Sequence, residues 1–100
     1  MPAYLLFDNV ELIDPAGLAR YAAAVAPSVA AHGGRYLAVA ATPEVVEGDP
    51  TLNSAVLIEF PDLASARAWY GSPDYQPLKA LRHRSARNTA VLFDGIDPAR

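Results

Sequence analysis

The sequence predicts one α+β domain of the ferredoxin-like kind, with strands and helices in the order βαββαβ and a four-stranded antiparallel sheet of strand order 4-1-3-2. Two observations support this prediction. Four short segments rich in Val, Ile, Leu, Tyr and Phe alternate in that order with segments of helical periodicity. The two βαβ-like halves have similar lengths, and 100 residues leave room for one domain. We therefore expect a single domain over residues 1–96 and a loose tail at 97–100.

The first half of the chain holds the expected first strand and first helix. Residues 3–10 are almost continuously apolar, which predicts a strand covered on both faces. Asp14 is placed to cap a helix whose first turn begins with proline, and the double glycine at 33–34 provides a left-handed stop. Pro27 lies inside this helix, so we expect a kink or a restart there. The apolar stripe at helical spacing consists of Leu18, Tyr21, Ala22, Val25 and Val29.

The second half repeats the pattern. Residues 35–42 and 53–60 are expected as the second and third strands, and the segment between them is an irregular excursion containing Gly and Pro. The remaining elements are a helix capped by Asp62 and ending at Tyr70, a helix with the basic end Arg82-His83-Arg84, and a strand at 88–93.

The sheet face away from the helices is expected to need a cover. The helices of such a fold lie on one face only, yet the first, second and fourth strands are apolar or nearly so toward both faces. A second copy of the chain provides the cover most economically, because a twofold axis pairs one face with itself. We therefore expect a homodimer through the sheet faces, with a shared cavity that has room for a small-molecule ligand.

Charge and composition argue against several classes of function. A formal net charge of −3 disfavours binding to nucleic acid or to an anionic membrane, since both require a clustered basic surface. No apolar run is long enough to span a membrane, and the N-terminus has no charged segment ahead of an apolar one, so a cytoplasmic protein is expected. The chain has no cysteine, and its two histidines are far apart without spaced carboxylates, so no metal site is expected. No phosphate loop, dinucleotide fingerprint or Ser-His-Asp spacing is present, and we expect no cofactor.

Several motifs are similar to those of a known family and stand in the same order. They are His32-Gly33-Gly34-Arg35-Tyr36-Leu37, Glu47-Gly48-Asp49, Ile58-Glu59-Phe60-Pro61, the block Ala66-Arg67-Ala68-Trp69-Tyr70-Gly71-Ser72-Pro73-Asp74-Tyr75-Gln76-Pro77-Leu78, and Arg82. On these residues the chain resembles, over most of its length, the family known as domain of unknown function 1330. The resemblance implies a dimeric α+β barrel.

The resemblance leaves the chemistry open. The wider superfamily includes cofactor-independent monooxygenases, muconolactone-type isomerases, haem-handling proteins and ligand-sensing domains, and the family itself has no settled activity. Leu5 departs from the family pattern, in which an aromatic residue often follows the tyrosine of the first strand. We therefore expect no aromatic cavity lining at that position.

Glu59 and His32 are the candidate catalytic residues. Glu59 alternates with the most apolar side chains of its strand and so lies on the opposite face. Burial would raise its pKa and suit it as a general base; the structural alternative is an ion pair with Arg35 or Arg82. His32 precedes the double glycine, where it either caps the helix or serves as a proton shuttle at the cavity mouth.

The candidate substrate-binding residues are Arg35, Tyr36, Trp69, Tyr70, Tyr75 and Arg82. Arg35 and Tyr36 are neighbours on a strand and point to opposite faces, so at most one lines a given cavity without a bulge. An arginine fork would hold a carboxylate or enolate oxygen, or pair with Glu59 or Asp49 instead. The aromatic side chains would stack on a ligand or, alternatively, pack the second helix layer.

Three functions remain open at this point. The first is a small cofactor-free enzyme acting on a hydrophobic organic acid, enol or phenol, with Glu59 or His32 as base and Arg35 or Tyr70 stabilising charge on oxygen. The second is a noncatalytic module that binds or senses a small ligand. The third is an accessory dimerisation domain whose sheets pack without a pocket.

Overall fold

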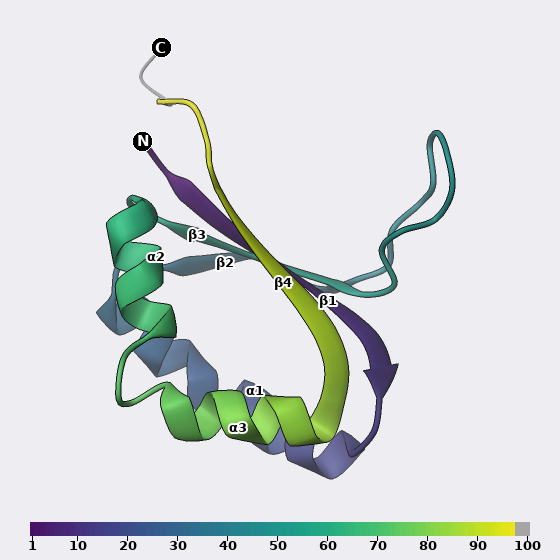
Figure 1. The fold of residues 1–100 in the computed structure, drawn as a ribbon, viewed down its shortest axis with the longest axis horizontal. Helices are drawn as coiled ribbons and strands as arrows, with labels where there is room; N and C mark the ends of the chain where they lie inside the picture. Colours follow the sequence, from purple (N-terminus) through teal and green to yellow (C-terminus); the bar gives the residue numbers. More distant parts are fainter. Residues whose placement is uncertain (98–100) are drawn as a thin grey trace.

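The computed structural model describes residues 1–97 and confirms the predicted ferredoxin-like fold (Figure 1). The four strands form one antiparallel sheet in the order β2-β3-β1-β4, which is the predicted order read from the other edge. Residues 98–100 of the predicted tail lie outside the described range. The elements along the chain are β1 (Ala3–Leu12), α1 (Pro15–Ala31), β2 (Arg35–Ala41), β3 (Ala55–Phe60), α2 (Leu63–Tyr70), α3 (Gln76–Ser85) and β4 (Ala86–Asp94).

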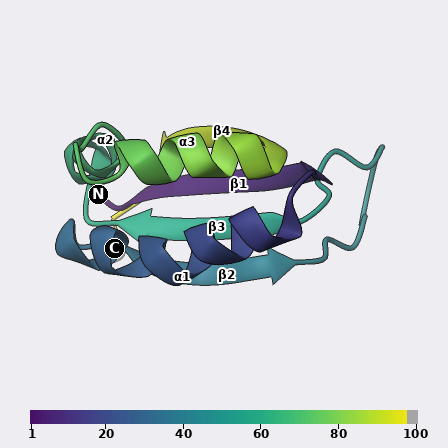
Figure 2. The same cartoon turned by 90° about the horizontal axis from the view of Figure 1, so that it is seen from below.

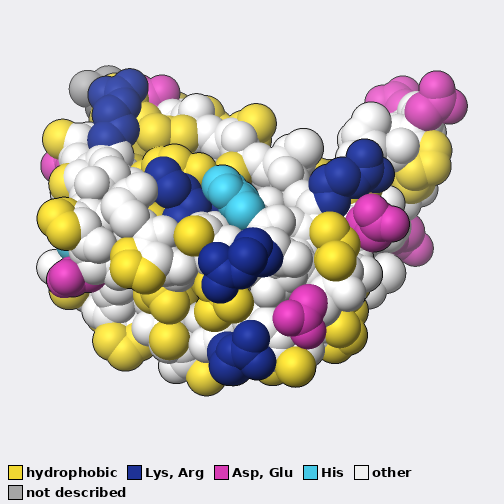
Figure 3. Space-filling model, turned by 60° about the horizontal axis from the view of Figure 1, so that its bottom comes forward, with side chains coloured by type: hydrophobic (Ala, Val, Ile, Leu, Met, Phe, Trp, Pro, Cys, Tyr) yellow, Lys and Arg dark blue, Asp and Glu magenta, His cyan; other side chains and the backbone are white. Residues whose placement is uncertain are grey.

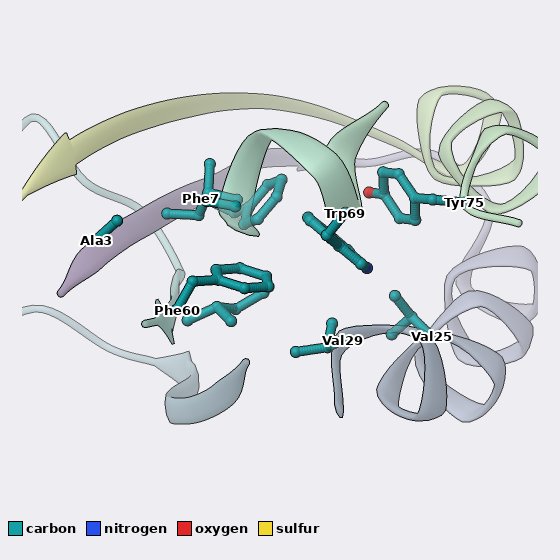
Figure 4. Packing of buried hydrophobic residues seen from close by; sticks show 10 residues of the cluster. Ala3, Phe7, Val25, Val29, Phe60, Trp69 and Tyr75 are labelled. Atoms are coloured by element: carbon teal, nitrogen blue, oxygen red, sulfur yellow. The ribbon is translucent and has the colours of Figure 1, made fainter. Parts of the chain in front are cut away.

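The core lies between the sheet and the helices, and Trp69 of α2 is at its centre. Helices α1 and α3 run side by side over one face of the sheet (Figure 2). The Trp69 side chain is fully buried, with its ring centroid 4.1 Å from that of Tyr75 and 5.6 Å from that of Phe60 (Figure 4). Its indole Nε1 donates to Ser28 Oγ of α1 at 3.0 Å. A buried indole needs such a partner for its N–H, so this bond fixes α2 against α1.

Three strand boundaries differ from the prediction. β1 continues past Val10 to Leu12, because a β-bulge between Asn9 and Glu11 lets the strand keep pairing with β4. β4 accordingly begins at Ala86, directly after α3. β3 begins at Ala55, two residues later than predicted, because the backbone N–H groups at positions 53 and 54 donate to a carboxylate of β1 instead of to the ladder.

The helix ends follow the predicted signals with two corrections. Gly33 has a φ of 77° and ends α1, and Asp62 caps α2 by accepting from the Ser65 backbone N–H at 2.7 Å. Asp14 occupies the N-cap position of α1, but its side chain makes no capping bond. Its backbone N–H donates to the Ser85 carbonyl at 2.8 Å and ties α1 to α3. α1 also continues through Pro27 without a restart, since the proline is exposed while the flanking valines hold the helix against the core.

The sheet face away from the helices, which we call the open face, is rich in apolar side chains. Cross-strand pairs on this face include Tyr4 with Phe93 and Leu6 with both Val91 and Leu57. Phe93 and Val91 are 49% and 54% exposed. Within one chain, this face therefore leaves a contiguous apolar surface in contact with solvent. The open face comprises Tyr4, Leu6, Arg35, Leu57, Glu59, Val91 and Phe93.

The loop of residues 42–54 projects from the end of the sheet (Figure 1). Glu44, Glu47 and Asp49 on this loop are exposed, and Figure 3 shows acidic side chains gathered on the projection while basic ones lie on the body of the molecule. Val46 is 90% exposed. The loop therefore contributes little to the core. None of the described helices is long and apolar enough to cross a membrane.

Asp8 joins β1 to the base of this loop and gives the first prediction. Its buried carboxylate accepts from the Asn53 backbone N–H at 2.8 Å, from Ser54 N–H at 3.1 Å and from Asn53 Nδ2 at 3.1 Å. The backbone hydrogen bond from Asn53 holds the pKa of Asp8 below its usual range. The carboxylate therefore favours the folded state most when it is ionised.

This depressed pKa predicts how stability depends on pH. The unfolded chain takes up a proton at Asp8 near its ordinary pKa of about 3.9, before the folded chain does, so the stabilisation is complete above that pH and is lost as the pH falls through the folded pKa. Urea denaturation between about pH 6 and pH 3 should show a steeper loss of unfolding free energy in the wild type than in Asp8→Asn. Equal slopes for the two proteins would contradict this account.

Candidate functional site

A pocket of about 360 Å³ lies on the helix side of the sheet, between α1, α3 and strands β1, β2 and β3. We call it the helix-side pocket. It is contained in a single chain, whereas the sequence predicts a cavity between the sheets of two copies. Its polar lining residues are Asn9, Tyr21, Tyr36 and Arg82, and its apolar ones are Phe7, Leu18, Ala22, Val25, Ala26, Val39, Ala40, Val56 and Ile58.

Two local features of the sequence leave this space unfilled. On α1, the small side chains of Ala22 and Ala26 face the pocket at positions where larger residues would fill it. On β2, pairing with β3 is irregular between Tyr36 and Ala41, and Ala40 has a φ of 50°, which residues other than glycine rarely adopt. Bulges and strained residues of this kind are common next to functional sites, because they redirect side chains at a strand end.

Arg82 is the central polar residue of the pocket. It is only 4% exposed, and no Asp or Glu within residues 1–97 forms an ion pair with it. Its Nε donates to the Tyr75 hydroxyl at 3.2 Å, its Nη1 to Asn88 Oδ1 at 2.5 Å, and its guanidinium lies 4.9 Å from the centroid of the Phe7 ring. A buried arginine usually has a carboxylate partner, so its neutral surroundings are unusual.

Two side chains extend this polar cluster to the pocket wall. The Tyr75 hydroxyl is 2.9 Å from that of Tyr21 on α1. On the other side, Asn88 Nδ2 donates to Asn9 Oδ1 at 3.2 Å between the paired strands β4 and β1. The cluster therefore connects α3, β4, β1 and α1 around one guanidinium.

The phenols of the pocket hold their protons firmly. Burial raises the pKa of Tyr36 to about 12, and burial together with the Tyr75 hydroxyl raises the pKa of Tyr21 further. Both therefore act as neutral hydrogen-bond donors at physiological pH. Next to the cluster, burial and the charges of Arg82 and Lys79 lower the pKa of His83, so this imidazole is neutral at pH 7.

Glu59 and Arg35 lie on the open face and not in this pocket. Their ion pair, Arg35 Nε to Glu59 Oε1 at 2.8 Å, is the structural alternative foreseen for Glu59. The Tyr4 hydroxyl also donates to Glu59 Oε2 at 3.2 Å. Tyr36, the neighbour of Arg35, lines the helix-side pocket, so the predicted opposite orientation of these two side chains is confirmed.

The remaining candidate site residues lie in different parts of the molecule. His32 Nδ1 lies 3.1 Å from the Ser28 carbonyl at the end of α1, which is the capping alternative, and it does not line the pocket. Trp69 and Tyr75 are core residues, although the Tyr75 hydroxyl supports Arg82. Tyr70 lines a second pocket of about 360 Å³ between α2, β1 and β4. Of the eight predicted site residues, the helix-side pocket contains Tyr36 and Arg82.

Asn9, Tyr21 and Asn88 belong to the site or its polar cluster but are not among the site residues predicted from the sequence. Tyr21 was assigned to the apolar stripe of the first helix, which is correct for its ring but leaves out its hydroxyl. Asn9 and Asn88 lie at or near the ends of the predicted strands 3–10 and 88–93. Each is an amide among the mostly apolar residues of its strand, and only the register shows that the two are cross-strand partners. In the described part of the chain, no group of three or more His, Asp or Glu side chains is arranged to hold a metal ion.

Fold and site together define a ferredoxin-like α+β protein with a mostly apolar, ligand-sized pocket and a buried cation. More specifically, the chain belongs to the family described as a domain of unknown function, DUF1330, which matches residues 2–96. The sequence matches none of the curated proteins with which it was compared.

Several solved structures share the fold. A protein of unknown function from Rhodopseudomonas palustris is 16% identical with a TM-score of 0.72, over 97% of this chain and 84% of that one. SnoaB, a cofactor-independent oxygenase from Streptomyces nogalater, is 16% identical with a TM-score of 0.65, over 96% and 94%. A dimeric ferredoxin-like protein of unknown function from Jannaschia sp. CCS1 is 17% identical with a TM-score of 0.61, over 95% and 100%. At these identities the likeness concerns the fold.

Proposed function

We propose that this protein binds a small, largely apolar organic acid, enol or phenol as its anion in the helix-side pocket and acts on it without a cofactor. The observation that carries the proposal is the guanidinium of Arg82, which is buried at the pocket and has no ion pair within residues 1–97. Burial of an arginine costs several kcal/mol unless an opposite charge compensates it. An anionic ligand in the pocket would supply that charge.

The size and lining of the pocket favour a small ring compound. A volume of about 360 Å³ lies at the lower end of the range for small-molecule sites. Most lining side chains are aliphatic or aromatic, and the polar groups gather around Arg82. Such an arrangement recognises a hydrocarbon body through apolar contacts and one charged oxygen through the cation.

The lining also limits the acid-base chemistry. The residues of the helix-side pocket include no carboxylate and no imidazole, and its phenols remain protonated. Glu59 and His32 lie elsewhere, so neither supports the role of base in this pocket. The ligand therefore has to be acidic enough to ionise beside Arg82, whose charge lowers the pKa of a bound acid. SnoaB, a cofactor-independent oxygenase, shares the fold, which supports the cofactor-free part of the proposal.

The second candidate function is noncatalytic binding. It is favoured by the same lining, because a pocket without a general base can hold an anion without transforming it. Turnover separates the two functions. An enzyme consumes its ligand, whereas a binding module returns it unchanged after denaturation of the protein.

We also propose that two copies associate through their open faces. The apolar side chains of that face are exposed in one chain, and three proteins of similar fold are described as dimeric. Association would bury these side chains, together with the ion pair of Arg35 and Glu59, against the same surface of a partner. The helix-side pocket would then remain within each copy. The cytoplasmic location expected from the sequence stays a prediction.

A thermal-shift screen, combined with a variant whose pocket is filled, tests the proposed ligand class. Thermal-shift measurements with aromatic carboxylic acids, enolisable diketones and acidic phenols should show a raised Tm for binders, by mass action, and smaller shifts for the matched methyl esters and ethers. Ala22→Phe fills the pocket from α1 and should abolish the shifts. Ala24→Phe, at an exposed position of the same helix that does not line the pocket, should keep them.

Two results would contradict the proposal. One is a screen in which neutral ligands stabilise the protein as well as their acids do. The other is binding that survives Ala22→Phe. For each acid that binds, mass spectrometry of the ligand after aerobic incubation distinguishes the enzyme from the binding module.

The dimer is tested by placing a charge on the open face. Val91 is 54% exposed in one chain, so lysine there is tolerated by the monomer but would place a charge in the apolar interface of a dimer. In sedimentation velocity at micromolar concentration, the wild type should sediment as a dimer and Val91→Lys as a monomer. Val46→Lys, on the projecting loop, should stay dimeric. A monomeric wild type, or a dimeric Val91→Lys, would overturn this interface.

A further inference from the structure

The polar groups around Arg82 form two hydrogen-bonded chains, and both end at the helix-side pocket. Arg82 carries donors but no acceptor, so the side chains of Tyr75 and Asn88, which form hydrogen bonds with it, must each turn an oxygen toward it. This constraint sets the direction of each hydrogen bond that follows along the two chains. These directions determine whether hydrogen-bond donors or acceptors face a ligand in the pocket.

The first chain passes through two asparagine side chains. Asn88 presents Oδ1 to Arg82 Nη1, which leaves its Nδ2 facing β1. This Nδ2 donates to Asn9 Oδ1 at 3.2 Å. The amide of Asn9 is thereby oriented, and its remaining group, Nδ2, has no hydrogen-bond partner within residues 1–97. Asn9 lines the helix-side pocket, so its Nδ2 group is a free hydrogen-bond donor at the pocket wall.

The second chain passes through two tyrosine hydroxyls. The fully buried Tyr75 hydroxyl accepts from Arg82 Nε at 3.2 Å, and among the described residues the oxygen of Tyr21, 2.9 Å away, is the acceptor within reach of its hydrogen. If Tyr75 did not donate to Tyr21, its own hydrogen would be buried without an acceptor. Tyr75 therefore donates and Tyr21 accepts. The hydroxyl hydrogen of Tyr21, another lining residue, is then free for a ligand.

We propose that Asn9 and Tyr21 contact the ligand oxygen directly, and that Arg82 is the positioning residue that orients both as donors while its charge stabilises the anion. This inference rests on the proposed function of the same pocket. It gives the reason why the polar end of the ligand should only accept hydrogen bonds, as that of an enolate, phenolate or carboxylate does. An amine or ammonium group, which brings donors of its own, would meet donors and a positive charge.

The bulge in β1 supports the role of Asn9. The pairing of β1 with β4 is regular up to Asn9 and Asn88 and shifts immediately afterwards, between Asn9 and Glu11. A regular strand alternates its side chains strictly, and a bulge at this point redirects the chain where the pocket begins. The cross-strand asparagine pair therefore stands at the last position of the regular ladder, where it is held by two strands.

The probe for this inference is para-nitrophenol, an acidic phenol whose anion absorbs visible light and whose pKa lies near neutrality. Absorption titrations with the full-length protein give both its affinity and its pKa when bound. We expect the bound pKa to fall below that of the free phenol. Asn9→Ala and Tyr21→Phe should each weaken binding of the anion about tenfold and move the bound pKa back toward the free value.

Asn88→Asp tests the orientation itself, because residue 88 does not line the pocket. An aspartate there only accepts, so the Asn9 amide would turn its Nδ2 toward it and its Oδ1 toward the ligand, and the new carboxylate would also neutralise the Arg82 charge. We expect a loss of anion binding at least as large as that of Asn9→Ala. Binding of para-nitrotoluene, a neutral molecule of similar shape, should remain within about twofold of wild type in all three variants and serves as the control for an intact pocket.

The outcomes separate this inference from the proposed function. If neither probe binds the wild type, or if Ala22→Phe binds both as the wild type does, the proposed pocket itself is wrong. If both probes bind in the pocket but the bound pKa is unshifted, or the variants at positions 9 and 21 bind the anion normally, the pocket stands and the inference is overturned. Unchanged anion binding in Asn88→Asp would overturn the positioning role of Arg82.

Discussion

The buried guanidinium of Arg82 is the interaction on which the candidate site depends. It comes from α3, donates to a tyrosine hydroxyl at the start of that helix and to an asparagine of β4, and lies over an aromatic ring of β1. Each contact neutralises part of the cost of burial, but none supplies a negative charge. The guanidinium thus joins the helix layer to the sheet. Its positive charge remains uncompensated by these contacts and faces the pocket.

The two faces of the sheet carry different functional groups: the pocket lies on the helix side, and the ion pair lies on the open face. On the helix side, alternate residues of β1 and β3 fill the core and leave a pocket where α1 has alanines. On the open face, Glu59 of β3 forms an ion pair with Arg35 of β2 among apolar neighbours. Because successive side chains of a strand point to opposite faces, a residue can serve one of these surfaces but not both. Glu59, the most conspicuous acid of the sequence, thereby belongs to the surface proposed for assembly.

Departures from regular structure concentrate at the same end of the sheet as the pocket. The bulge of β1 follows Asn9, β2 loses its register before the projecting loop, and Ala40 has a left-handed backbone conformation at that point. Each lowers the stability that a regular sheet would provide. The buried aromatic cluster around Trp69 offsets this, since it packs α2 and Tyr75 against both the sheet and α1. A rigid core beside an irregular rim is a favourable arrangement for a binding site.

The sequence by itself determined the element order, the strand order and the separation of Arg35 from Tyr36, because these follow from local periodicity, turn residues and the alternation of a strand. The ion pair of Glu59 with an arginine and the capping position of His32 were each one of two alternatives from the sequence; the capping depends on positions four residues apart, and the ion pair depends on the register of β2 with β3. Only the tertiary structure decided that the pocket lies beneath α1, that Arg82 is buried without a carboxylate partner among residues 1–97, and that Asn9 faces Asn88. Those facts depend on contacts between residues far apart in the chain, on a register set by a bulge and on space left by small side chains. No periodic pattern encodes them, since each arises where two elements meet.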